Sequence, residues 1–111
     1  MKISDFNLRQ AAFRYLQSFH LARNFNVGKD EEDILIITLC DYPFYEGDQK
    51  LVITFTNIKD LKVGDVWGIV DLEINILDIS DHQLEGLKYR VKEEEYELFS
   101  FHCKSFDFEI L

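Results

Sequence analysis

Two cysteines and two of the three histidines are the side chains best suited to nucleophilic or metal chemistry. Cysteine and histidine act together as nucleophile and base, or as ligands of zinc. His102 and Cys103 are adjacent, and adjacent residues of a strand point to opposite faces, so they cannot form a nucleophile–base pair. Zinc ligands usually come in close pairs such as C-x2-C, a spacing that Cys40, Cys103, His20 and His102 lack. We therefore expect no catalytic residue, no metal centre and no cofactor.

Acidic residues gather in two segments that a divalent cation could in principle bind. The segment 30–33 is entirely acidic, and the segment 41–48 contains Asp41, Glu46 and Asp48. Calcium loops alternate their oxygen ligands and end in a distal Glu, an order that neither segment shows. A charge run of this kind is typical of a solvated loop that limits pairing at strand ends. Both segments are instead candidates for contact with a partner.

Aromatic residues lie among these acids. Tyr42, Phe44 and Tyr45 fall within the acidic segment 41–48, and Trp67 lies between two glycines in VGDVWG. The rings could fold back over a sheet edge, or they could anchor a partner, because aromatic centres with charged rims are typical of protein interfaces. The partner interpretation gives a predicted contact set: Asp30, Glu31, Glu32, Asp33, Tyr42, Tyr45, Glu46, Asp48, Trp67, Glu93, Glu94 and Glu95.

The charge balance limits the kind of partner. The 111 residues include 12 basic and 21 acidic side chains, a formal net charge of -9. Residues 1–29 hold five bases and one acid, a net charge of +4, so residues 30–111, with 7 bases and 20 acids, carry -13. This balance argues against nucleic acid and against an anionic membrane. It favours a basic protein as the partner.

Composition indicates one globular domain over residues 1–111. Hydrophobic residues make up 47% of the chain and aromatic residues 14%, which is enough for a packed core. The N-terminus has no apolar run of the kind found in a secretory signal, and charges interrupt every apolar stretch before membrane-spanning length. With only two cysteines, we expect a soluble cytoplasmic protein with two buried reduced thiols. A single disulfide between Cys40 and Cys103 is the alternative interpretation.

Several strands follow from apolar periodicity. Residues 34–40, ILIITLC, form a β-branched run typical of a strand buried on both faces, and residues 51–58 alternate as a strand with one buried face. These two strands are expected to form a hairpin. Residues 70–79 alternate until Leu77, where the slip predicts a bulge or a strand end. Residues 88–92 form a further strand, with Tyr89 and Val91 inward, and 93–95 are expected at a solvent-exposed hairpin end.

The two ends of the chain differ in how clearly their residues predict a secondary structure. Residues 96–111 give the longest strand signal, and their apolar parity changes after Cys103, which predicts a kink at Lys104 or Ser105. Near the N-terminus, a helical spacing runs from Leu8 to Phe19, with Ser4 as a candidate N-cap. The apolar residues of the same stretch also alternate as in a strand, except at Gln17. The pattern therefore does not decide between helix and strand for residues 5–23. We favour a short helical or irregular entry and then a strand near residues 13–22.

These elements predict an all-β protein with room for one short N-terminal helix. Its five or six antiparallel strands would form a twisted sandwich or a partly open barrel. Several segments carry a resemblance: YLQSFHLA, ILIITLCD, LVITFTNIKDL, LEINILDIS and YRVKEEEYELFSFHCKSFDFEI. Over residues 13–111 the chain resembles small acidic β-rich bacterial proteins encoded beside polymorphic toxins and described as immunity proteins. The shared features are the strand end at 55–58 and the pattern of Phe101, Cys103 and Phe106.

The resemblance implies a fold and a class of function, and it carries over no catalytic residue. The leading hypothesis is a non-enzymatic immunity protein that occludes the basic cleft of a cognate toxin with its acidic surface. A second hypothesis is a structural module that self-associates, as a homodimer, through an exposed sheet edge. A third, an enzyme or small-ligand binder, would require a concave pocket with convergent polar groups.

Overall fold

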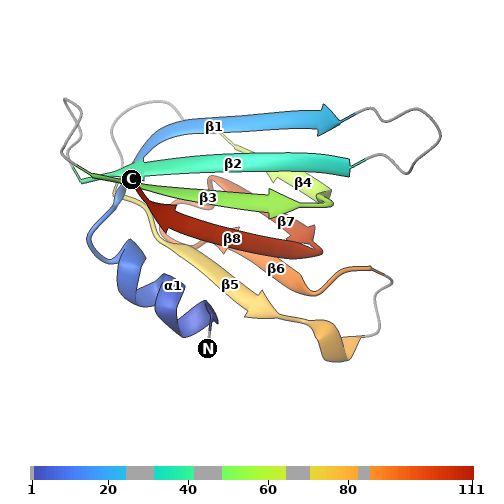
Figure 1. The fold of residues 1–111 in the computed structure, drawn as a ribbon. Coiled ribbons are helices and arrows are strands. Elements are labelled where there is room, and N and C mark those ends of the chain that lie inside the picture. Colours follow the sequence, from blue (N-terminus) through green and yellow to red (C-terminus); the bar gives the residue numbers. More distant parts are fainter. Residues whose placement is uncertain (1, 25–31, 42–48, 65–70, 83–85) are drawn as a thin grey trace.

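The computed structural model describes residues 2–24, 32–41, 49–64, 71–82 and 86–111, which form two antiparallel sheets and one helix. The elements are α1 (Lys2–Gln10), β1 (Tyr15–Asn24), β2 (Glu32–Cys40), β3 (Lys50–Thr56), β4 (Lys59–Val63), β5 (Ile74–Asp78), η1 (Ser80–His82), β6 (Tyr89–Glu93), β7 (Phe99–Cys103) and β8 (Ser105–Ile110). Sheet A has the strand order β1-β2-β3-β8 and sheet B the order β4-β7-β6-β5 (Figure 1). The all-β prediction with one N-terminal helix is confirmed, with eight strands in these residues in place of five or six.

Sheet A is built on the hairpin predicted from its two most apolar segments. β2 and β3 pair antiparallel, and Leu35, Ile37 and Ile53 are fully buried. Ile34 and Ile36, on the other face of β2, are only half-buried. The prediction that this strand is buried on both faces is therefore wrong, because sheet B covers one face of sheet A only.

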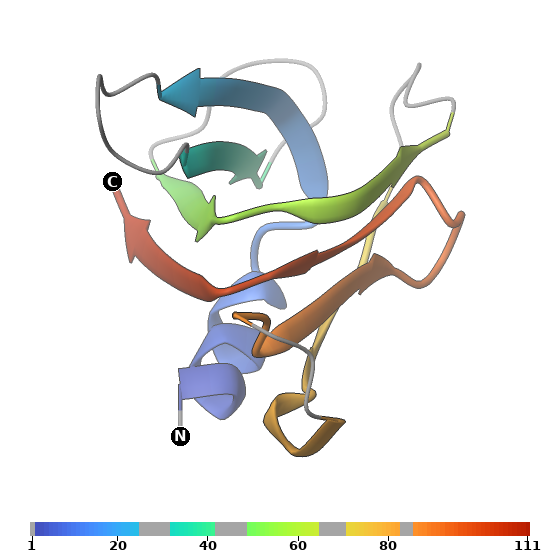
Figure 2. The ribbon, with the colours of Figure 1, turned by 90° about the vertical axis from the view of Figure 1, so that its right-hand side faces the viewer.

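The chain passes from one sheet into the other at two bends, one between β3 and β4 and one between β7 and β8. β3 leads into β4 through Asn57 and Ile58, and β7 leads into β8 through Lys104 alone. The backbone N–H of Lys104 donates to the carbonyl of Thr56 at 2.9 Å, which holds the two bends side by side. Asn57 and Asp60 have φ angles of 55° and 57°, and the β4–β7 register shifts in the same place, as at a bulge. Figure 2 shows both bends, and the predicted kink at Lys104 or Ser105 is confirmed.

The N-terminal residues form a helix followed by a strand, as we favoured. The helix begins at Lys2, so Ser4 lies inside it, and the prediction that Ser4 is the N-cap is wrong. Phe6 is the buried residue of α1, and its ring lies 5.6 Å from that of Phe108. Leu8 is 76% exposed, so the predicted helical stripe does not face the core. The pairing of β1 with β2 shifts between Leu16 and Ser18, where the alternation in the sequence breaks.

Helix α1 closes the open side of the two sheets, between β8 and β5. Phe6 packs against β8, while the side-chain amide of Gln10 pairs with the backbone of Ile74 in β5. Its Nε2 donates to the Ile74 carbonyl at 2.6 Å, and its Oε1 accepts from the Ile74 N–H at 3.0 Å. The amide thus takes the place that a neighbouring strand would have at this edge.

Phenylalanine rings from both sheets meet in the core. Phe55 of β3 lies 4.9 Å from Phe101 of β7 and 6.3 Å from Phe106 of β8, between ring centroids. All three side chains are at most 1% exposed. Edge-to-face contacts at such distances stabilise a core beyond the area that they bury. The two sheets therefore share one interior, and the bends between β3 and β4 and between β7 and β8 bring them face to face.

Two predictions for sheet B are confirmed, namely the strand end near Leu77 and the inward residues of β6. Ile76 is buried and Leu77 is 50% exposed, and β5 ends at Asp78, which confirms the strand end predicted near Leu77. Tyr89 is half-buried and Val91 fully buried on β6, as expected. No described helix has both the length and the apolar character needed to cross a membrane.

Candidate partner-binding surface

Glu93 is a buried carboxylate that accepts hydrogen bonds from the backbone. Glu93 lies at the end of β6 and its side chain is 0% exposed, so the prediction that it faces solvent is wrong. Its Oε1 accepts from the N–H groups of Tyr96 and Leu98 at 2.7 and 3.4 Å. Its Oε2 accepts from those of Glu73 and Glu95 at 3.1 and 2.7 Å. The carboxylate therefore organises the turn between β6 and β7 and is not available to a partner.

The next two residues of that turn are exposed and belong to a larger acidic group. Glu94 and Glu95 face solvent, and the N–H of Glu94 donates to the carbonyl of Glu73 at 2.9 Å. Asp71 and Glu73, before β5, are also exposed. We call these four residues, Asp71, Glu73, Glu94 and Glu95, the acidic end. Sequence reasoning missed Asp71 and Glu73, although their alternation with buried Leu72 and Ile74 was the available signal.

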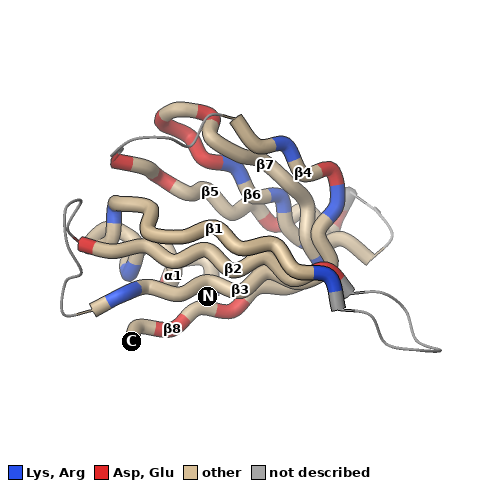
Figure 3. Tube along the Cα trace, turned by 90° about the horizontal axis from the view of Figure 1, so that it is seen from above, with Lys and Arg blue, Asp and Glu red and all other residues tan. Residues whose placement is uncertain are grey.

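Arg14 is the cation around which the acidic end is arranged. Its Nε forms an ion pair with Asp71, and this hydrogen bond raises the pKa of Arg14 above its ordinary value. The charges of Glu73 and Glu95 act in the same direction. Arg14 interacts with three of the four carboxylates, and Glu94 is held by Asn75 instead, so the group as a whole stays negative. Figure 3 shows acidic segments near β5 and the β6–β7 turn.

A hollow opens beside the acidic end, between the last turn of α1 and β5. The volume of this hollow is ≈ 380 Å³. Its polar lining comes from α1, from β5 and from residues next to β1, β5 and β6: Asn7, Gln10, Arg14, Glu73, Asn75 and Glu94. Asn75 donates to a carboxylate oxygen of Glu94 at 2.9 Å, which orients that side chain along the rim. The hollow offers amide and carboxylate groups suited to basic side chains of a partner.

Asp33 lies at the other end of the long hairpin. It pairs with Arg23 near the end of β1, and its carboxylate accepts from the Arg23 Nε at 3.0 Å. Asp71, in contrast, bridges to Tyr15 at the start of β1. The predicted contact residues in the described parts of the chain therefore do not form a single cluster. The backbone of Glu32 belongs to β2, opposite Asn24.

Most of the other predicted contacts lie outside the described residues. These are Asp30, Glu31, Tyr42, Tyr45, Glu46, Asp48 and Trp67. The residues flanking two of these segments are placed, however. Cys40 pairs with both Tyr15 and Lys50, so the strand ends on either side of 42–48 lie at the same end of sheet A as Asp71. Asp71 itself directly follows the segment 65–70 that contains Trp67.

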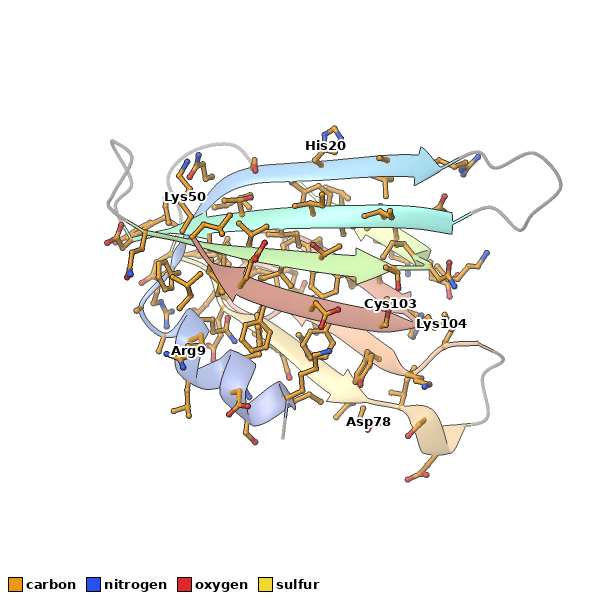
Figure 4. All side chains as sticks on the ribbon, in the orientation of Figure 1. Arg9, His20, Lys50, Asp78, Cys103 and Lys104 are labelled. Atoms are coloured by element: carbon orange, nitrogen blue, oxygen red, sulfur yellow. The ribbon has the colours of Figure 1, made fainter. Side chains whose placement is uncertain are left out.

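The cysteine and histidine side chains do not converge. Cys40 and Cys103 are buried and are not in a disulfide, and burial raises the pKa of the Cys103 thiol to about 12. His102 lies on the outer face, where its Nδ1 is 3.2 Å from a carboxylate oxygen of Asp60. Figure 4 shows His20 projecting outward from β1, away from Cys103. Among the residues that the structure describes, no three His, Cys, Asp or Glu side chains are grouped to hold a metal ion.

Fold and surface together define a small two-sheet antiparallel protein with charged, exposed surfaces. The family described as "Immunity protein PIM8" matches residues 1–109. The chain therefore belongs to this family, and the resemblance to immunity-type proteins is confirmed. Neither the curated proteins nor the solved structures include a match to the chain.

Proposed function

We propose that this immunity protein neutralises a cognate bacterial toxin, without catalysis, by covering a basic surface of that toxin. Family membership implies a protein partner, and the acidic end is the observation that carries the proposal for how it is bound. Three of its four exposed carboxylates interact with Arg14, and two of the four, Glu73 and Glu94, line a polar hollow. The proposal places this action in the cytoplasm, where thiols that form no disulfide, such as those of Cys40 and Cys103, stay reduced.

The proposed mechanism is occlusion guided by charge. Toxins that act on nucleic acids need a positive cleft for phosphate groups, and a net charge of -9 attracts such a cleft over long distances. The contact itself would then be made by short-range pairs between carboxylates and the basic side chains of the cleft. A toxin whose cleft is filled in this way cannot reach its substrate.

The proposed contact set keeps the sequence prediction, changed where the structure requires it. Glu93 is removed because it is buried, and Asp71 and Glu73 are added. Glu94 and Glu95 remain at its centre. Tyr42, Tyr45 and Trp67 stay in the proposal as aromatic anchors, since the residues that flank their segments lie at the acidic end. The acidic residues Asp30, Glu31, Glu32, Asp33, Glu46 and Asp48 remain proposed contacts.

Charge reversal at the acidic end tests the proposal. A toxin captured with the wild-type chain should bind Glu95→Lys about tenfold more weakly, mainly through slower association at low salt. Asp81→Lys makes the same charge change in η1, away from the acidic end, and should leave the affinity within about twofold. Both residues are exposed, so neither change should affect folding. Equal binding by both variants, or binding that salt leaves unchanged, would contradict charge-guided occlusion.

A homodimer through a sheet edge is the second candidate, and one observation favours it. Within the described residues β1 pairs along its length only with β2, apart from the bridge between Tyr15 and Asp71. Its outer edge also carries Leu21, which is 49% exposed. Sedimentation of the purified chain at micromolar concentration would show a dimer that Leu21→Lys dissociates and Leu8→Lys does not. A monomer at these concentrations would remove this candidate.

A further inference from the structure

A second charged surface, of opposite sign, covers the outer face of sheet B. Two rows of facing residues cross this sheet: Lys62, Ser100, Lys92 and Asn75 in one, and Lys59, His102, Arg90 and Leu77 in the other. Figure 3 shows the basic segments on β4 and β6. The chain has a net charge of -9, so four basic residues on one face make that face locally positive. We call those residues of the two rows that line its hollows and carry a cation, a hydroxyl or an imidazole, namely Lys62, Arg90, Lys92, Ser100 and His102, the basic face.

The basic face is hollowed, and Arg90 lies where its hollows meet. Three hollows of ≈ 260, ≈ 430 and ≈ 120 Å³ are described on this face, and Arg90 lines all of them. Lys62 lines two, one together with His102 and one together with Lys92. Ser100 adds a hydroxyl between these cations. A row of shallow hollows along a sheet suits an extended chain better than a single compact ligand.

Two of the basic residues that line these hollows, Arg90 and Lys62, are not neutralised by an ion pair in the described part of the chain. Lys92 lies 3.9 Å from a carboxylate oxygen of Glu97, and His102 lies 3.2 Å from one of Asp60. Arg90 and Lys62 have no ion pair with any residue that the structure describes. A guanidinium presents a planar fork of N–H donors that matches a carboxylate in two hydrogen bonds. Arginine in a hollow is also among the side chains that contribute most to binding at interfaces.

We propose that the basic face binds an acidic, extended segment of the partner protein, with a carboxylate held by Arg90. This rests on the proposed function, since the segment belongs to the same toxin whose basic surface meets the acidic end. The two surfaces are continuous, because Glu94 of the acidic end lines a hollow together with Arg90 and Lys92. The partner would therefore present both signs of charge across one footprint.

An acidic peptide fits this face better than a nucleic acid. Asp60, Glu94 and Glu97 border the cations, and a continuous run of phosphates would meet these carboxylates as well as the overall negative charge. A peptide can place its few carboxylates opposite Arg90 and Lys62 and other side chains opposite the bordering acids. Charge complementarity on this scale fixes the register of a bound segment.

A probe titration tests the face directly, without the toxin. Hexaglutamate added to the isotopically labelled chain at low salt should shift the backbone amide signals of Arg90, Lys92 and Ser100. The double variant Lys62→Glu/Arg90→Glu should bind the probe about tenfold more weakly or not measurably. Lys104→Glu is the matched control, because Lys104 is exposed at the bend outside the basic face, and should bind within about twofold of wild type.

Three results would overturn the inference. The first is no shift at these amides with hexaglutamate, and the second is an equal loss of binding in Lys104→Glu. The third is saturation of the same amides by inorganic phosphate or duplex DNA at lower concentration than by the peptide, which would assign the face to phosphate. Circular dichroism of the double variant, unchanged from wild type, shows that lost binding is not lost folding.

Binding to the toxin separates this inference from the proposed function. If the wild-type chain binds no toxin, the proposed function fails, whatever the probe shows. If wild type binds a toxin and Lys62→Glu/Arg90→Glu binds it equally well, the proposed function stands and this inference fails. Weakening by the basic-face variant and by Glu95→Lys, with Lys104→Glu unchanged, supports both.

Discussion

Glu93 illustrates how one buried side chain can determine the shape of a surface turn. A carboxylate without exposure to water loses its hydration, and four backbone N–H groups replace that hydration here. Three of those N–H groups, from Glu95, Tyr96 and Leu98, belong to the connection that presents Glu94 and Glu95, and the fourth belongs to Glu73, before β5. The exposed acids are therefore positioned by a buried one. In the sequence the three glutamates are indistinguishable, because the burial of Glu93 depends on where residues 73 and 96–98 come to lie.

Substitution of Glu93 should be costly although the change is small. Glu93→Gln replaces one accepting oxygen with an N–H2 group that faces two N–H donors, and should lower the free energy of unfolding by about 1–3 kcal/mol. Glu95→Gln, at an exposed position two residues away, should change it by less than about 0.5 kcal/mol. Urea unfolding followed by circular dichroism measures both. Similar stability of the two variants would show that the four hydrogen bonds do not stabilise the turn.

Cys103 should be chemically inert in the folded chain. Burial raises the pKa of its thiol from the ordinary value of 9.0 to about 12, so the reactive thiolate is almost absent at pH 8. In a Cys40→Ala background, a thiol reagent should label Cys103 in denaturant but not in buffer. The raised pKa also makes stability fall as the pH rises from about 9 towards 12, because only the unfolded state then ionises the thiol. Rapid labelling of the folded chain at pH 8 would contradict this account.

At the scale of the elements, the sequence predicted the strands well and the sheets poorly. The alternation of Leu51, Ile53 and Phe55 predicts β3 and its buried face, since side-chain period alone decides both. The division of residues 96–111 between two sheets was foreseen only as a kink at Lys104 or Ser105. Strand order depends on pairing between distant residues, which periodicity does not contain. The basic face was missed for the same reason, because Lys62 and Arg90 meet only through the pairing of β4, β7 and β6.

Helix α1 should depend on Gln10 to hold it against β5. Gln10→Ala removes both hydrogen bonds to the backbone of Ile74, so we expect a loss of about 1–2 kcal/mol in the free energy of unfolding. The Ile74 amide should also exchange its hydrogen faster, since it loses its acceptor. Gln17→Ala, in the exposed irregularity of β1, serves as the control and should change neither quantity by much. Unchanged exchange at Ile74 would show that α1 is held by the Phe6 contacts alone.

At the scale of the whole molecule, charge and packing are separated in space in the described part of the chain, except at the buried carboxylate of Glu93. The core holds phenylalanine rings from both sheets, and every large charged surface is carried by strands or turns outside it. The acidic end and the basic face border one another at Glu94, so a partner that contacts one side of the protein meets both signs. This arrangement favours recognition of one orientation of the partner over others, because a rotated partner would bring like charges together.

The shared core predicts that both sheets unfold in one transition, as a single domain over residues 1–111. Phe55 of sheet A packs on Phe101 of sheet B, so Phe55→Ala should cost about 3–5 kcal/mol and weaken both sheets equally. Hydrogen exchange of β2 and β6 amides should accelerate by the same factor, and urea curves should keep one midpoint. Leu8→Ala, at a 76% exposed position, should leave that midpoint nearly unchanged. Exchange that accelerates in sheet A alone would mean that the bends, and not the rings, hold the sheets together.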